Sequence, residues 1–249
     1  MVSGMVKDDQ SRAITARIAG ATILFYIATS VAGTIVFGRI TTGHGIAARL
    51  ANIAEHLPQM GLSFVLQLLT IFEALILAVA LYALTRGERA NLALFALTCR
   101  LIEGALNALP AIAMLALIDL APSAVTAISS ETAALQTLGS SVLKLQGWSI
   151  VVSTPVFGVG SACYYYLFAR GRSIPAPLAW FGVLSSALLV VAIPLEGLQS
   201  IRGPLGFYVW LPSLLFELTF APWLLIKGVA PRFGAGKTFD RTLKLPLFF

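Results

Sequence analysis

Three polar side chains that could do chemistry stand at helical spacing within a long apolar stretch. Arg100, Glu103 and Asn107 lie in residues 90–118, a stretch that is otherwise largely apolar. Spacings of three and four residues place them on one face of a helix. Ionised groups deep in a bilayer are costly, so they must face a partner or water inside the protein. The sequence therefore predicts a buried polar face that can bind an ion or a small polar ligand.

Two further carboxyl groups, those of Glu73 and Glu217, lie near the centres of other apolar stretches. Three ionised carboxylates around the single guanidinium of Arg100 would leave excess negative charge in a low-dielectric site. We therefore expect one carboxylate to pair with Arg100 and the others to be protonated, hydrogen-bonded or bound to a cation. This arrangement suits proton or cation coupling. A fixed polar knot that locks helix packing explains the same residues equally well.

A second polar pair, Lys144 and Glu196, lies near the ends of two apolar stretches, with Gln146 and Gln199 close by. Lys144 is expected to extend its amine to lipid headgroups, and Glu196 to reach water or Lys144. We interpret this outer polar pair as structural. The tyrosines at 164–166 are interpreted as anchors at the membrane interface.

Several other chemistries lack the residues they need. The two histidines, His44 and His56, share one connection between apolar stretches, which argues against haem ligation or Ser–His catalysis within the membrane. The two cysteines, Cys99 and Cys163, fall within apolar stretches and predict buried thiols rather than a disulfide framework. We expect no metal site, no cofactor and no catalytic residue.

Composition indicates that the natural solvent of this chain is lipid. Hydrophobic residues make up 58% of its 249 residues and charged residues only 11%, against about a quarter charged in a soluble domain. The net charge is +6, but the Lys and Arg residues stand at the ends of apolar stretches rather than on a polar domain. We therefore expect no nucleic-acid partner. The expected partner is the lipid bilayer.

Six stretches reach the roughly 20 apolar residues that a bilayer-crossing helix needs. They are residues 18–37, 60–84, 90–118, 142–168, 178–198 and 205–226. Backbone polar groups in lipid must be satisfied within the segment, so we predict an all-α, polytopic integral membrane protein with six transmembrane helices. Nothing in the composition divides the chain, and residues 1–249 are predicted to form a single transmembrane domain.

The distribution of the 17 Lys and Arg residues predicts the orientation of this domain. Most of them fall in the N-terminal segment, the second and fourth connections and the tail, whereas the outer connections hold only Arg39, Arg49 and Arg202. Positive residues favour the cytoplasmic side. We therefore place both termini in the cytoplasm, with residues 1–16 as an N-terminal segment and residues 230–249 as a basic tail, and we expect the inner membrane.

The two longer outer connections are each expected to contain a short amphipathic helix. In residues 43–57, apolar residues recur at helical intervals, which predicts a helix lying on the membrane surface. Residues 119–141 are rich in Ser, Thr and Ala and predict a second short surface helix.

Five prolines interrupt the predicted spans, at positions 110, 155, 194, 212 and 222. Proline inside a helix removes a backbone hydrogen bond and often produces a kink, which predicts hinges or a cavity. Prolines are also simply more frequent in membrane helices, so both interpretations stay open.

Three short motifs carry a resemblance to a known family. They are Ala-Arg-Ile-Ala-Gly at 16–20, Arg-Leu-Ile-Glu at 100–103, and Phe-Glu-Leu at 216–218 followed by Trp-Leu-Leu-Ile-Lys-Gly-Val at 223–229. With these motifs the chain resembles the bacterial membrane domain-of-unknown-function family 4386 over most of residues 14–229. The resemblance implies a polytopic bacterial inner-membrane protein and supplies no activity.

Three classes of function fit these residues. The first is a small-molecule transporter linked to protons or cations, with a midplane ligand- or ion-binding site formed by Glu73, Arg100, Glu103, Asn107 and Glu217. The second is a non-catalytic membrane module that binds a lipid or protein partner. The third, a membrane enzyme acting on a lipid or quinone, is the least favoured, because no nucleophile–base pair or metal ligand set is visible.

Overall fold

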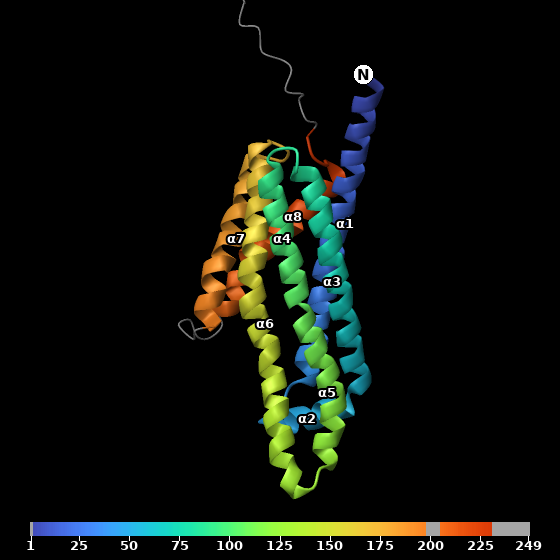
Figure 1. Cartoon of the computed structure of the whole chain (residues 1–249), viewed down its shortest axis with the longest axis vertical. Coiled ribbons are helices and arrows are strands. Elements are labelled where there is room, and N and C mark those ends of the chain that lie inside the picture. The colour runs from blue at the N-terminus through green and yellow to red at the C-terminus, as the bar shows by residue number, and fades with distance from the viewer. Residues whose placement is uncertain (1, 198–204, 231–249) are drawn as a thin grey trace, which may run out of the picture.

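The computed structural model describes residues 2–197 and 205–230, with side chains described for 9–128, 131–197 and 208–230. All regular structure in these residues is helical, as predicted. In chain order the helices are α1 (Val2–Ile40), α2 (Ile46–Glu55), α3 (Leu57–Thr85), α4 (Ala90–Leu106), α5 (Ala108–Thr126), α6 (Ser129–Arg170), α7 (Ala176–Gly197) and α8 (Leu205–Ile226). They form one elongated bundle (Figure 1).

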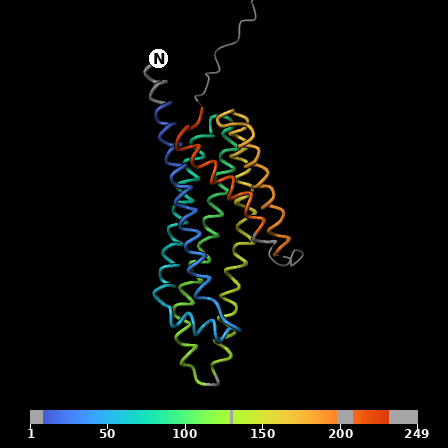
Figure 2. The backbone as a smooth tube through the Cα atoms, turned by 180° about the vertical axis from the view of Figure 1, so that it is seen from behind, coloured from blue at the N-terminus to red at the C-terminus, as the bar shows by residue number. Residues whose placement is uncertain are grey.

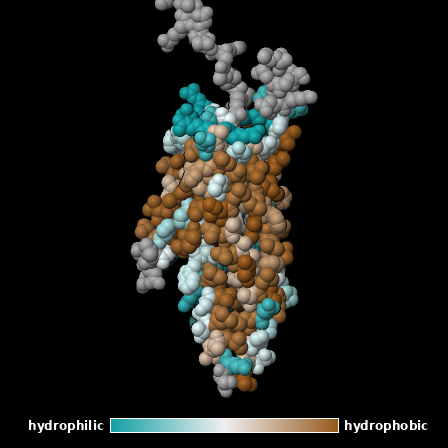
Figure 3. All heavy atoms as spheres, viewed as in Figure 1, coloured by the Kyte–Doolittle hydropathy of each residue, from teal (hydrophilic) through white to brown (hydrophobic). Residues whose placement is uncertain are grey.

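Six helical segments in the described residues are long and apolar enough to cross a bilayer, as the sequence predicts. They are Asp9–Ile40, Leu57–Thr85, Ala90–Thr126, Glu131–Arg170, Ala176–Gly197 and Tyr208–Ile226. Large apolar side chains lie exposed on these segments, with Phe72 60% and Leu184 66% exposed. Hydrophobic residues dominate the middle of the face shown in Figure 3. Apolar exposure on this scale requires a lipid environment.

The third segment consists of two helices, α4 and α5, that are interrupted at Asn107. Pro110 has no backbone N–H and cannot bond to the carbonyl of Leu106, the last residue of α4. The backbone N–H of Asn107 still donates to the carbonyl of Glu103, at 2.9 Å. The interruption therefore follows directly after the polar face predicted from the sequence.

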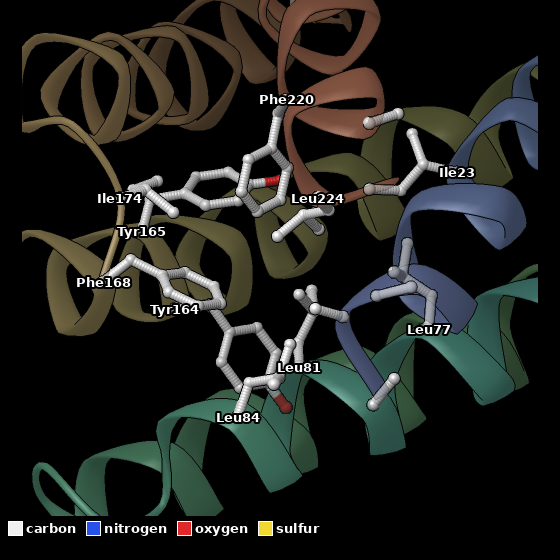
Figure 4. Close-up of a cluster of buried hydrophobic side chains, with 14 of the residues drawn as sticks. Ile23, Leu77, Leu81, Leu84, Tyr164, Tyr165, Phe168, Ile174, Phe220 and Leu224 are labelled. Atoms are coloured by element: carbon white, nitrogen blue, oxygen red, sulfur yellow. The ribbon is translucent and has the colours of Figure 1, made fainter. Parts of the chain in front are cut away.

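Three buried hydrophobic clusters lie in the described part of the bundle, and the smallest of them joins α6 to α7 through Phe157, Leu189 and Ile193. The largest joins α1, α3, α4, α6, α7 and α8, and includes Tyr164, Tyr165, Phe168 and Phe220 (Figure 4). The hydroxyl of Tyr164 donates to the carbonyl of Ala78 at 3.0 Å, which ties α6 to α3. Tyr164 and Tyr165 are 0% and 6% exposed, so their prediction as interfacial anchors is wrong.

The second cluster packs α2 against α5. Leu50 and Ile53 of α2 are buried beside Met114 and Leu117 of α5. The predicted amphipathic helix is therefore present at Ile46–Glu55, but its buried apolar side chains face protein, where the sequence analysis placed them against the membrane surface. The apolar face of an amphipathic helix can be buried against protein as well as against lipid, so the pattern alone does not distinguish the two.

The prediction of a second short surface helix within residues 119–141 is wrong. Helix α5 continues to Thr126 and α6 begins at Ser129, so only two residues separate two long helices. Likewise, α1 begins at Val2, so the described part of the predicted segment 1–16 is helical. The predicted basic tail, 230–249, lies outside the described residues except for Ala230.

Both described ends of the chain lie at the same end of the bundle as the α3–α4 and α6–α7 connections (Figure 1). Helix α8 runs obliquely across the back of the bundle, from beside α7 to beside α1 (Figure 2). It lies close to α1 at Gly20, where an added Cβ would lie 2.7 Å from the carbonyl oxygen of Ala221. A side chain at this position would push α8 away from α1.

Replacing Gly20 by alanine should therefore destabilise the protein, by about 1–3 kcal/mol, because the backbone oxygen cannot yield as a flexible side chain can. Gly38→Ala is the matched control on the same helix, since nothing lies within 4 Å of the position that an added Cβ would take there. Alanine is the better helix former, so the control should be neutral or slightly stabilising. Thermal unfolding in detergent, followed by circular dichroism, measures both; equal midpoints would contradict the close approach.

Candidate functional site

The centre of the site is a buried ion pair on α4. Arg100 and Glu103 are each 2% exposed, and Nη1 of Arg100 lies 3.3 Å from Oε2 of Glu103, one turn along the same helix. The guanidinium also lies over the ring of Phe157 from α6, with Cζ 4.4 Å from the ring centroid. Its Nε atom has no hydrogen-bond partner in the described residues. Arg100 therefore keeps unused capacity to donate hydrogen bonds.

Asn107 extends this pair to the interruption between α4 and α5. Its side-chain amide donates to Oε1 of Glu103, the carboxylate oxygen that does not face Arg100. The amide of Gln67 from α3 donates in turn to the backbone carbonyl of Asn107, at 3.2 Å. The three residues predicted from spacing thus form one connected polar row, anchored to α3.

Glu217 of α8 shares a small cavity with Arg100, although no ion pair within 4 Å joins the two in the described residues. Arg100 and Glu217 both line this cavity of about 10 Å³, together with the hydroxyl-bearing side chains of Tyr26, Ser161 and Tyr165. This volume is room for about one water molecule. Glu217 lies within electrostatic range of both Arg100 and Glu103. One cation is therefore flanked by two carboxyl groups at the junction of α1, α3, α4, α6 and α8.

Glu73 has a different set of partners. Oε2 of Glu73 accepts a hydrogen bond from the hydroxyl of Thr29 on α1, at 2.7 Å, and Thr29 in turn accepts one from Thr70 at 3.3 Å. Glu73 does not line the cavity. Tyr26, one turn along α1 from Thr29, lies within electrostatic range of Glu73 and also of the other three charged groups. The structure thus brings together four of the five predicted residues and sets Glu73 beside them.

The residues that the sequence analysis missed are uncharged. Tyr26, Phe157, Ser161 and Tyr165 complete the surroundings of Arg100. Each stands in a long apolar helix that has little amphipathic periodicity. Without that periodicity, spacing does not reveal which face of the helix turns inward. For Tyr26, Ser161 and Tyr165 the available signal is a hydroxyl group within a predicted span, and Phe157 offers no such signal.

The predicted outer pair, Lys144 and Glu196, does not form an ion pair within 4 Å in the described residues. Lys144 is exposed on α6 and lines a groove with Arg49 of α2, while Glu196 lies half-buried on α7. The described residues also contain no group of three or more His, Cys, Asp or Glu side chains that could hold a metal ion.

Long apolar helices around a small polar centre define a multi-pass integral membrane protein. Within that class, the chain belongs to the family of the domain of unknown function DUF4386, whose profile matches residues 18–228. This confirms the resemblance noted from the sequence motifs. No curated protein and no solved structure matches the chain.

The ion pair predicts a non-additive effect on stability. Arg100→Met leaves Glu103 buried without its cation and should cost about 3–5 kcal/mol, as should Glu103→Met for the opposite reason. The double variant removes both charges, so it should recover most of that loss. Thermal unfolding in detergent measures all three variants. Losses that simply add in the double variant would show that Arg100 and Glu103 do not depend on each other.

Proposed function

We propose that this protein is a proton-linked small-molecule transporter of the bacterial inner membrane. The observation that carries the proposal is the charge balance of the enclosed centre, where Arg100 already has Glu103 as an ion-pair partner and Glu217 lines the same cavity. A second carboxylate in a low-dielectric site needs a neutralising charge. A proton is the charge that a cavity of about 10 Å³ can receive.

In this proposal Glu217 is the group that gains and loses the proton. When Glu217 is neutral, Arg100 pairs with Glu103 alone. When Glu217 is ionised, it competes with Glu103 for the guanidinium, whose Nε is free to donate. Tyr26, Ser161 and Tyr165 line the same cavity, and their hydroxyls supply the groups for a proton relay in this proposal.

Helix α8 is the element that we propose to move. Glu217 stands five residues from Pro212 and five from Pro222, and both prolines lie inside α8. A helix that contains two residues without a backbone N–H bends at lower cost than an uninterrupted one. The enclosed cavity is too small for a solute, so transport requires an opening motion, and a bend of α8 would couple such a motion to the charge of Glu217.

The proposed orientation places the end of the bundle that carries both described termini in the cytoplasm. Arg86, Arg89, Arg170 and Arg172 belong to the two connections at that end. Positive residues in short connections favour the cytoplasmic side. The family resemblance supports a bacterial inner membrane.

Infrared difference spectra between acid and alkaline pH, on protein in lipid, test the protonation step. The wild-type spectrum should contain a carbonyl band from carboxyl groups that gain a proton, and Glu217→Gln should remove one component of that band. Glu196→Gln, which changes a carboxyl near the end of α7, should leave this component in place. If the spectrum of Glu217→Gln retains every component, Glu217 keeps one protonation state and the proton-linked mechanism is wrong.

Hydrogen–deuterium exchange tests the proposed motion separately. Protection of peptides from α8, after correction for the intrinsic effect of pH on exchange, should fall when Glu217 becomes ionised. Glu217→Gln should hold α8 at one level of protection across the same pH range. A wild-type α8 with constant protection would favour the alternative, a non-catalytic membrane module in which these charges form a fixed polar knot.

A further inference from the structure

A cationic groove lies at the opposite end of the bundle from Arg86 and Arg170, between α2 and α6. It has a volume of about 340 Å³ and is lined by Gly45, Ile46, Arg49, Ser140, Leu143 and Lys144. Beside the groove α2 lies close to α6 at Gly139, where an added Cβ would lie 3.0 Å from Leu50. It is separate from the centre around Arg100.

The charges of this groove are of one sign. Arg49 and Lys144 come from different helices, and none of the lining residues is acidic. Neither cation has a carboxylate within 4 Å in the described residues. The Nε atom of Arg49 donates to the backbone carbonyl of Gly43 at 3.4 Å, which orients the guanidinium beside the loop before α2. Two cations beside the hydroxyl of Ser140 are a set of donors suited to a phosphate group.

The depth of the groove matches that of a lipid headgroup. Trp148 lies one turn from Lys144 along α6 and is 60% exposed. Tryptophan side chains concentrate at the boundary between the hydrocarbon and the headgroups. Lys144, one turn further from the membrane centre, therefore lies at the level of the phosphates. Ile46 and Leu143 supply an apolar floor on the same groove.

We infer that this groove binds the phosphate of an anionic phospholipid such as phosphatidylglycerol. Arg49, Lys144 and Ser140 contact the phosphate, while Ile46 and Leu143 contact the glycerol and the start of an acyl chain. An anionic lipid is preferred over a zwitterionic one because the groove offers no carboxylate to an ammonium headgroup. The bound lipid would join α2 to α6 across the groove.

Native mass spectrometry of the full chain in detergent tests this site, with phosphatidylglycerol as the probe. The double variant R49Q/K144Q should bind this lipid about 30-fold more weakly, from the contribution of two cations near an anionic headgroup. R86Q/R170Q removes the same charge at the other end and should bind like the wild type. R49K/K144R keeps the charge and should retain most of the binding.

Three results would overturn the inference. The first is unchanged binding of phosphatidylglycerol by R49Q/K144Q with circular dichroism like that of the wild type. The second is equally tight binding of phosphatidylethanolamine, which would remove the preference for an anionic headgroup. The third is displacement of the lipid by inorganic phosphate at equal concentration, which would identify a site for free anions instead.

Discussion

The structure depends on keeping one guanidinium out of the hydrocarbon. An isolated ion costs several kcal/mol to bury even after relaxation, so Arg100 must be surrounded by groups that compensate its charge. Glu103 supplies the opposite charge from the next turn of α4, and Phe157 supplies an aromatic face from α6. The side-chain amide of Asn107 donates a hydrogen bond to the second carboxylate oxygen of Glu103. The enclosure of this charge requires α1, α3, α4, α6 and α8 to meet at one depth.

Packing between helices in lipid relies on van der Waals contact, because lipid chains offer apolar side chains as good a solvent as the protein does. The bundle gains this contact by letting α1 and α8 approach at Gly20, and by packing Phe220 of α8 edge-on against Phe168 of α6, with ring centroids 5.7 Å apart. Phe216 precedes Glu217 and packs edge-on against Tyr165, at 4.4 Å. In this arrangement the aromatic cluster therefore places Glu217 at the cavity that Arg100 also lines.

Not all features of the fold follow from patterns in the sequence. The stretch 119–141 has the Ser, Thr and Ala content of a surface connection, yet it continues α5 and α6 almost without interruption. Composition cannot separate a short surface helix from the extension of a long one, since both satisfy their backbone groups internally. The amphipathic pattern of α2 identified a helix but not its partner, which is α5, through Leu50 and Ile53.

The sequence by itself determined the six apolar segments and the row of Arg100, Glu103 and Asn107, because length, hydropathy and spacing along one helix are local properties. Only the tertiary structure decided that Glu217 lines one cavity with Arg100, while Glu73 accepts a hydrogen bond from Thr29. Which face of a helix turns inward, and which helix it meets, depends on the rotation of each helix within the bundle. That rotation is set by close packing among neighbours, and a helix that is apolar on every side leaves no record of it in its own sequence.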